Sequence, residues 1–237
     1  IEELLPRKNE LVRPPVANLD QLVILTALAD PAPDLRLIDR LTVFAQWNEV
    51  TPVLCFNKAD LVNQEAQDKL KEIYGPTGFP MVFCSTVTGE GIEDVKALLH
   101  GKFSVLAGNS GVGKSSLMNA ISDRWNLATG HVSEKLGRGR HTTRHVELFQ
   151  LDSETLLADT PGFSTLTVPE DIKREELSRL FPEFLDRLGD CRFATCMHKN
   201  EPDCAVKHAL ANGEVAQSRY DNYLAFLEEV IQQERSF

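Results

Sequence analysis

The order of two short motifs constrains this chain more than any other feature. Residues 108–115 read Gly-Asn-Ser-Gly-Val-Gly-Lys-Ser and fit G-x-x-x-x-G-K-[ST], a loop whose backbone N–H groups cradle phosphates. Residues 57–60 read Asn-Lys-Ala-Asp and fit N-K-x-D, the element that recognises guanine in GTPases. Ordinary GTPases carry the guanine reader after the phosphate loop, whereas here it comes first. The rotated order predicts a circularly permuted GTPase, a tolerable rearrangement because domain termini often lie close together.

Apolar segments typical of buried strands alternate with segments of helical periodicity. The expected strands are 22–27, 50–56, 81–84 and 103–107, the expected helices are 34–48, 65–73, 92–99 and 114–121, and a hairpin is expected over 145–158. This alternation predicts an α/β fold with a mostly parallel sheet and helices on both faces. Ligands bind such sheets at the carboxyl ends of the strands, and Asn57, Gly108 and Asp159 each follow a strand end.

The pattern changes beyond about residue 165, where helical segments surround a group of Cys and His residues. We expect a GTPase domain at 19–165 and a small helical zinc-binding domain at 166–237. Residues 1–18 read as the remnant of a preceding unit and a linker, because the chain begins without a methionine. A helix packed on a core is expected over 215–231. Its apolar stripe consists of Tyr220, Tyr223, Leu224, Leu227 and Ile231.

The charge distribution restricts the classes of partner. A net charge of −10 argues against a protein that coats nucleic acid through bulk charge. Basic residues gather after the phosphate-loop helix, at Lys135, Arg138, Arg140 and Arg144. Such a run is either a solvated loop or a functional switch, and its position favours the switch. The longest apolar stretches are too short to span a bilayer, so we expect no membrane partner. We also expect a monomer.

The phosphate loop supplies the first part of the candidate nucleotide site. Gly108, Gly111 and Gly113 let the backbone point its N–H groups at phosphate oxygens, and Lys114 adds a positive charge at the β- and γ-phosphates. The helix that begins there adds the positive end of its dipole. The segment follows an apolar strand and opens a helix, as this mechanism requires.

Guanine selection is assigned to the upstream motif. The Asp60 carboxylate can accept hydrogen bonds from both N1–H and N2–H of guanine, a pairing that adenine does not offer. The backbone of Ser85 and Thr86 is expected to close over the guanine O6. Read alone, Asp60 could instead belong to a helix-capping turn. The expected GTP-binding residues are Asn57, Lys58, Ala59, Asp60, Ser85, Thr86, Gly108, Asn109, Ser110, Gly111, Val112, Gly113, Lys114, Ser115, Ser116, Asp159 and Gly162.

Mg²⁺ is the expected cofactor of the nucleotide. The Ser115 hydroxyl can bind it directly. Asp159 opens an Asp-Thr-Pro-Gly segment and can hold the ion through water, while the Gly162 N–H can sense a γ-phosphate. The basic segment 135–144 is interpreted as the switch loop. It offers Thr143 as a further ligand, with Thr142 as the alternative.

Phe163 stands where many GTPases carry a glutamine that orients the attacking water. A phenylalanine cannot do this, so another group must be recruited. His141 in the switch loop is the local candidate, and a solvated loop histidine is the alternative interpretation. The expected catalytic residues are His141, Lys114 and Thr143.

A second cluster lies near the end of the chain. Its members are Cys191, Cys196, His198 and Cys204. Three sulfurs and one imidazole form a ligand set for a tetrahedral zinc ion, which is structural because no position stays open for a substrate. Disulfides are the alternative, but three clustered cysteines cannot all pair, and a GTPase is expected in the reducing cytoplasm. Cys55 and Cys84 read as buried thiols in apolar strands.

Together these motifs resemble the bacterial ribosome small-subunit-dependent GTPase A family across essentially all 237 residues. The segments that carry the resemblance are Arg13–Gln21, Asn57–Asp60, Gly108–Ser116, Gly137–Arg144, Asp159–Gly162 and Cys191–Cys204. The resemblance implies GTP hydrolysis late in assembly of the small ribosomal subunit, binding to 16S rRNA, and stimulation by that subunit. It also implies an N-terminal OB-fold, whose final strand residues 1–16 resemble. The family's switch histidine falls on His141 and its Mg²⁺ threonine on Thr143, and its zinc ligands fall on the Cys/His cluster.

Two other classes of function compete with this interpretation. A P-loop ATPase or kinase is disfavoured by the guanine reader at 57–60. A zinc-stabilised RNA adaptor with a merely structural nucleotide is disfavoured by Thr143 and Asp159, because a passive site needs no γ-phosphate sensor.

Overall fold

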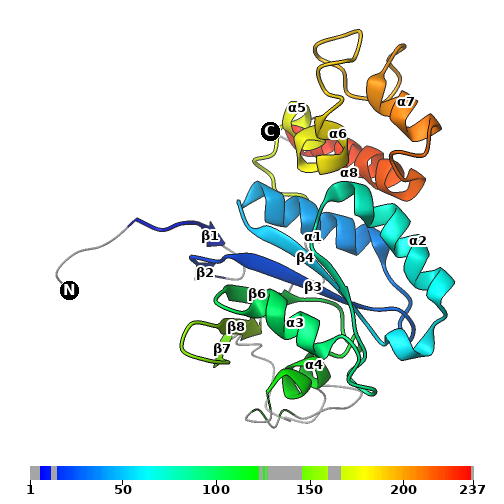
Figure 1. The fold of residues 1–237 in the computed structure, drawn as a ribbon. Coiled ribbons are helices and arrows are strands. Elements are labelled where there is room, and N and C mark those ends of the chain that lie inside the picture. The colour runs from blue at the N-terminus through cyan, green and yellow to red at the C-terminus, as the bar shows by residue number, and fades with distance from the viewer. Residues whose placement is uncertain are drawn as a thin grey trace.

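The computed structural model describes residues 6–11, 15–122, 125, 127, 146–159 and 167–235, which form a sheet flanked by helices and a helical module beside it (Figure 1). The strands are β1 (Glu10–Leu11), β2 (Val16–Ala17), β3 (Gln21–Ala27), β4 (Thr51–Asn57), β5 (Met81–Phe83), β6 (Phe103–Ala107), β7 (Glu147–Gln150) and β8 (Leu156–Asp159). The α-helices are α1 (Leu35–Trp47), α2 (Gln64–Tyr74), α3 (Ile92–Leu99), α4 (Lys114–Ile121), α5 (Arg174–Leu177), α6 (Pro182–Leu185), α7 (Ala205–Ala211) and α8 (Gln217–Arg235). Short 3₁₀ turns are η1 (Ala59–Leu61), η2 (Gly75–Thr77) and η4 (Ser178–Leu180).

The central sheet has the strand order β5-β4-β3-β6-β8-β7, and only the β7–β8 pair in it is antiparallel. The predicted α/β class with a mostly parallel sheet is therefore confirmed. Every residue of β3 is buried, because a parallel strand in mid-sheet is covered on both faces. Ala27 pairs with Asn57 and Leu106 with Asp159, so the ends of these strands meet at one edge of the sheet.

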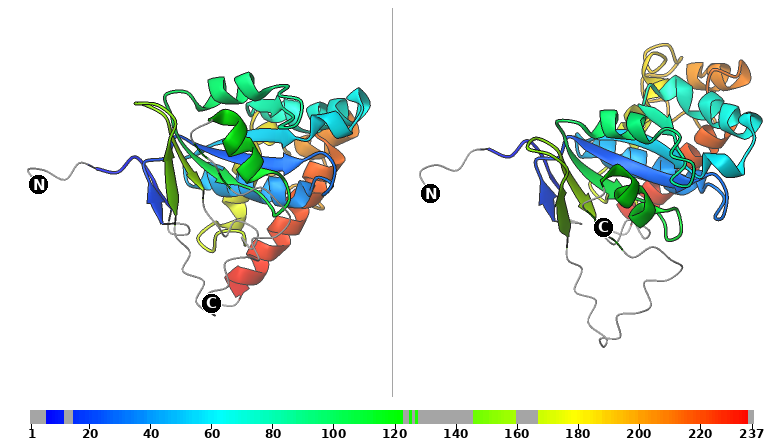
Figure 2. Two further views of the ribbon diagram at one scale, coloured as in Figure 1. Left: turned by 90° about the horizontal axis from the view of Figure 1, so that it is seen from below. Right: turned by 60° about the horizontal axis from the view of Figure 1, so that its bottom comes forward.

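The two faces of the sheet carry different helices, with α1 on one face and α3 and α4 on the other (Figure 2). Alternate β3 residues explain this division: Leu22 and Ile24 pack in the core with α1 and α2, whereas Val23 and Leu25 pack in the core with α3 and α4. Helix α1 begins where Asp34 caps it through a 3.0 Å hydrogen bond to the Leu37 N–H.

The helices α5 to α8 form the C-terminal module, which has its own core. Phe181, Phe184, Tyr223 and Phe226 are fully buried in this core, and α1 contributes Val43 to it. The stripe expected for α8 was only partly correct. Phe226 and Val230 are buried, whereas Leu224 and Ile231 are half-buried, because α8 contacts α1 as well as its own module. Within the described ranges, no helix is both long and apolar enough to cross a bilayer.

Candidate nucleotide-binding site

The phosphate loop connects the end of β6 to the start of α4. Gly113 caps α4 with φ 97°, a conformation that side chains other than hydrogen rarely permit. A Cβ atom at Gly113 would lie 2.4 Å from the Asn57 Nδ2, and one at Gly108 would lie 2.2 Å from the Leu25 carbonyl oxygen. The two glycines are therefore required because neighbouring strand ends approach the loop closely.

Lys114 places its ammonium group over this loop. Its Nζ donates to the carbonyl oxygens of Gly108 at 2.5 Å and Asn109 at 3.1 Å. Burial lowers the pKa of Lys114, and the Asp159 carboxylate opposes that shift. The charge lies among the loop carbonyls, where it can meet the phosphates of a nucleotide held by the loop.

Asn57 connects the guanine-reader motif to the phosphate loop. The side chain is fully buried, and its Nδ2 donates to the Val112 carbonyl oxygen at 2.9 Å. Its Oδ1 accepts from the Thr86 N–H at 3.4 Å. The Ala59 N–H donates to the Cys84 carbonyl oxygen at 3.0 Å, which joins the same segments through the backbone. The buried Asn57 amide thus holds the guanine-reader segment, the phosphate loop and the loop after β5 in fixed positions relative to one another.

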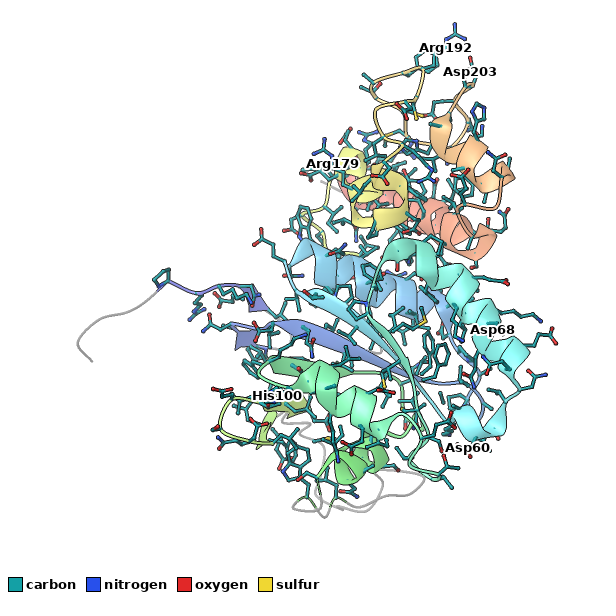
Figure 3. The ribbon with its side chains drawn as sticks, in the orientation of Figure 1. Asp60, Asp68, His100, Arg179, Arg192 and Asp203 are labelled. Carbon is teal, nitrogen blue, oxygen red and sulfur yellow. The ribbon has the colours of Figure 1, made fainter. Side chains whose placement is uncertain are left out.

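Asp60 lies in η1 with its side chain exposed, at the end of the molecule far from Arg192 and Asp203 (Figure 3). The buried Ser85 hydroxyl donates to the Asp60 Oδ1 at 2.5 Å. Helix α2 is capped instead by Asn63, whose side chain accepts from the Ala66 N–H at 3.1 Å. The alternative of a capping role for Asp60 is therefore wrong, and its carboxylate is held by the loop that follows β5.

The β3–α1 loop of residues 28–34 also borders this site, although none of its residues is among the predicted site residues. The Leu28 N–H donates to the Asn57 carbonyl oxygen at 2.9 Å, and the Lys58 Nζ donates to the Asp30 carbonyl oxygen. A small cavity lies between this loop and the phosphate loop, lined by Pro31 and Asn109 among others. The signal was available, because the loop after the central strand of a parallel sheet must lie beside its neighbours' loops.

The predicted residues that the structure describes converge at this edge. Ser115 and Ser116 lie in the first turn of α4, and Asp159 ends β8 beside the strand that feeds the phosphate loop. The remaining predicted residues lie outside the described part of the chain. They are His141, Thr142, Thr143, Gly162 and Phe163.

The Cys/His cluster lies in the C-terminal module, and its four ligand atoms lie within 4.8 Å of one another. The His198 Nδ1 is 3.6 Å from the Cys191 Sγ and 3.3 Å from the Cys204 Sγ, and these two sulfurs are 4.0 Å apart. A tetrahedral ion with metal–sulfur bonds of about 2.3 Å needs sulfurs about 3.8 Å apart. The cluster therefore fits a tetrahedral metal ion.

The pKa values of this cluster bear on metal binding in two opposite ways. Burial lowers the pKa of His198, which favours the neutral imidazole that a metal requires. Burial and the neighbouring thiols raise the pKa of Cys196 to about 12. Metal binding would therefore displace thiol protons. The Glu201 carboxylate orders the loop by accepting from the N–H groups of Met197, Lys199 and Asn200.

A phosphate loop bridged by a buried asparagine to an upstream N-K-x-D segment defines the class of circularly permuted P-loop nucleotide-binding proteins. The sequence profile of the RsgA GTPase family matches residues 4–169. The "Small ribosomal subunit biogenesis GTPase RsgA" of Carboxydothermus hydrogenoformans is 52% identical over 237 residues, covering 100% of this chain and 81% of that protein. The chain belongs to the RsgA GTPase family.

Two solved structures agree with this assignment. The crystal structure of YjeQ from Thermotoga maritima superposes with a TM-score of 0.79 at 40% identity, covering 97% of this chain and 78% of that one. The structure of YloQ, described as a circularly permuted GTPase, gives a TM-score of 0.79 at 38% identity, covering 98% of this chain and 75% of that one. The predicted family and permuted order are thereby confirmed.

Proposed function

We propose that this protein hydrolyses GTP in a Mg²⁺-dependent reaction coupled to late maturation of the small (30S) ribosomal subunit, that it binds 16S rRNA, and that the subunit stimulates turnover. The observation that carries GTP binding is the Asn57 bridge between the guanine reader and the phosphate loop. The ribosomal role is supported by the names of relatives that are 43–52% identical, each a small ribosomal subunit biogenesis GTPase.

Each loop of the site is proposed to have its own role in binding or hydrolysis of the nucleotide. Asp60 selects guanine, the phosphate loop with Lys114 holds the phosphates, and Ser115 and Asp159 hold Mg²⁺. Thr143 is proposed as the further Mg²⁺ ligand from the switch loop. His141 is proposed to orient the attacking water, because Phe163 cannot do so.

The proposed domains are a permuted GTPase domain at 19–165 and a helical zinc-binding domain at 166–237, preceded by an OB-fold remnant and linker at 1–18. Zinc is the proposed ion of the Cys/His cluster, because three thiolates and one imidazole suit it in a closed tetrahedral site. The protein is proposed to be a cytoplasmic monomer.

Asp60→Asn tests the guanine assignment. The amide cannot accept from both N1–H and N2–H, so we expect GDP affinity to fall by about 100-fold or more, the equivalent of two charge-assisted hydrogen bonds. The same amide can donate to the O2 of xanthine, so preference should shift toward xanthosine diphosphate. Titrating both nucleotides against wild type and variant measures the switch.

Asp68→Asn is the matched control, because Asp68 is an exposed aspartate of α2 that pairs with Lys71 (Figure 3). It should bind GDP as wild type does. The assignment of the guanine reader is wrong if Asp60→Asn and Asp68→Asn bind GDP equally well. Binding of ADP as tight as that of GDP by the wild-type protein would support an ATPase instead.

A further inference from the structure

The interface between α1 and the C-terminal module contains a buried ionic cluster centred on Arg219 of α8. The guanidinium is fully buried and donates to both oxygens of Glu183 at 2.7 and 3.0 Å. Its third nitrogen, Nη1, donates to the Asp39 Oδ1 at 2.8 Å. Asp39 and Glu183 more than offset the effect of burial and raise the pKa of Arg219 above its usual value. Arg219 thus joins α1 to α6 and α8.

Asp39 collects further hydrogen bonds from both sides of this interface. The Asn222 Nδ2 of α8 donates to its Oδ2 at 2.6 Å, and the Tyr74 hydroxyl at the end of α2 donates to its Oδ1 at 2.9 Å. Removing one partner from such a network leaves an uncompensated buried charge, which is strongly destabilising. These directional hydrogen bonds therefore restrict the position of α1 relative to α8 more than apolar packing alone would.

Two more contacts hold α1 against the module along its length. The Arg40 guanidinium forms a bidentate pair with Glu229 of α8 at 2.7 and 2.9 Å. The Trp47 Nε1 donates to the Asp171 carboxylate at 3.0 Å. Figure 1 shows the result, in which α1 lies between the sheet and α8.

The N-terminal end of α1 lies next to the nucleotide site. Asp34 caps the helix, and the β3–α1 loop before it meets the guanine reader through the contact between Asp30 and Lys58. Residues of this loop and of the first turns of α1, among them Pro31 and Leu37, line the small cavity shared with the phosphate loop. A shift of α1 along or across the sheet would therefore move one wall of the nucleotide site.

We propose that Arg219 and Asp39 are positioning residues for nucleotide binding, through which the docked C-terminal module holds α1 and the β3–α1 loop against the nucleotide site. The inference rests on the proposed function, because it names a regulation of that same guanine-nucleotide site. By linkage, a partner that shifts the C-terminal module changes nucleotide affinity, and the nucleotide changes the affinity for that partner by the same factor.

The test measures release of methylanthraniloyl-GDP from the full chain after addition of excess GDP, at a temperature well below thermal unfolding. Arg219→Lys keeps a cation but loses the fork that spans Asp39 and Glu183. Release should become at least about five-fold faster, the lower end of typical coupling between sites. Asn222→Ala should give a smaller increase of the same sign. Zinc content should stay at the wild-type value in both.

Glu228→Gln is the matched control on α8, because Glu228 is exposed and its carboxylate pairs with the exposed Lys199 of the same module. It should release the probe at the wild-type rate. If Arg219→Lys does not fold, the double variant Arg40→Gln with Asn222→Ala removes two α1–α8 contacts and replaces it. Folded variants with lowered thermal stability but wild-type release rates would overturn the proposal and leave only a structural role. A wild-type protein that fails to bind the probe would contradict the proposed function itself.

Discussion

Purified Cys196→Ser protein is expected to contain no stoichiometric zinc. Three remaining ligands leave the tetrahedral set incomplete, and structural zinc contributes on the order of 10 kcal/mol or more in small modules. The loop that carries the ligands should then loosen, since the metal is what ties its cysteines and His198 together. Its remaining anchors to α8 include the hydrogen bonds from the Tyr220 hydroxyl to the His198 carbonyl oxygen at 2.6 Å and from the Tyr223 hydroxyl to the Met197 carbonyl oxygen at 2.9 Å. Elemental analysis and amide hydrogen exchange measure the two effects.

The central sheet of the Cys196→Ser variant should keep its native structure. The Arg219 cluster that joins α1 to α6 and α8 contains none of the four metal ligands, so GDP affinity should be retained. Cys55→Ala is the matched control, because Cys55 is a buried thiol of β4 outside the cluster, and it should keep one zinc per chain. Absence of zinc from the wild-type protein would contradict the assignment of the metal.

Lys114→Ala is expected to lower GTP turnover by roughly 10² to 10³-fold, the usual effect of removing one preorganised donor to developing charge. The physical reason is the position of the ammonium over the phosphate loop, where it reaches the Gly108 and Asn109 carbonyls. Nucleotide affinity should fall as well, because the charge contacts the ground-state phosphates. Single-turnover hydrolysis and GDP titration separate the two losses.

Lys96→Ala serves as the control for Lys114→Ala. Lys96 is a lysine of α3 whose ammonium pairs with Glu93, away from the phosphate loop. Its loss should leave turnover and GDP affinity at wild-type values. Equal turnover in the two variants would show that Lys114 does not act on the phosphates.

The fold was largely predictable because each part of the sheet has a local signal. Strand β3 is a run of mostly apolar residues, and Leu35, Ile38, Leu41 and Ala45 follow at helical spacing, so the predicted helix 34–48 lies within one residue of the ends of α1. The phosphate loop was predictable because Gly113 and Gly108 serve a backbone geometry that other residues cannot adopt. The Cys/His spacing likewise predicted a metal-binding cluster. In the structure its four ligand atoms lie close enough together to bind one ion.

The contacts between α1 and the C-terminal module were not predictable from periodicity. Asp39 and Thr42 are polar residues of α1, yet both are fully buried. Arg219 is likewise buried within a helix of otherwise ordinary pattern. Burial of these groups depends on partners more than a hundred residues away, as in the pair of Arg219 with Asp39. No local pattern in one sequence encodes such a pairing.

GTP turnover with and without small ribosomal subunits is the most direct test of the proposed function. The isolated protein should turn over slowly, at roughly 10⁻⁴ to 10⁻² per second, as GTPases do without full transition-state stabilisation. Addition of purified 30S subunits should raise that rate by at least about ten-fold, whereas 50S subunits at the same concentration should not. Equal rates under the three conditions would contradict a GTPase whose cycle is coupled to the small subunit.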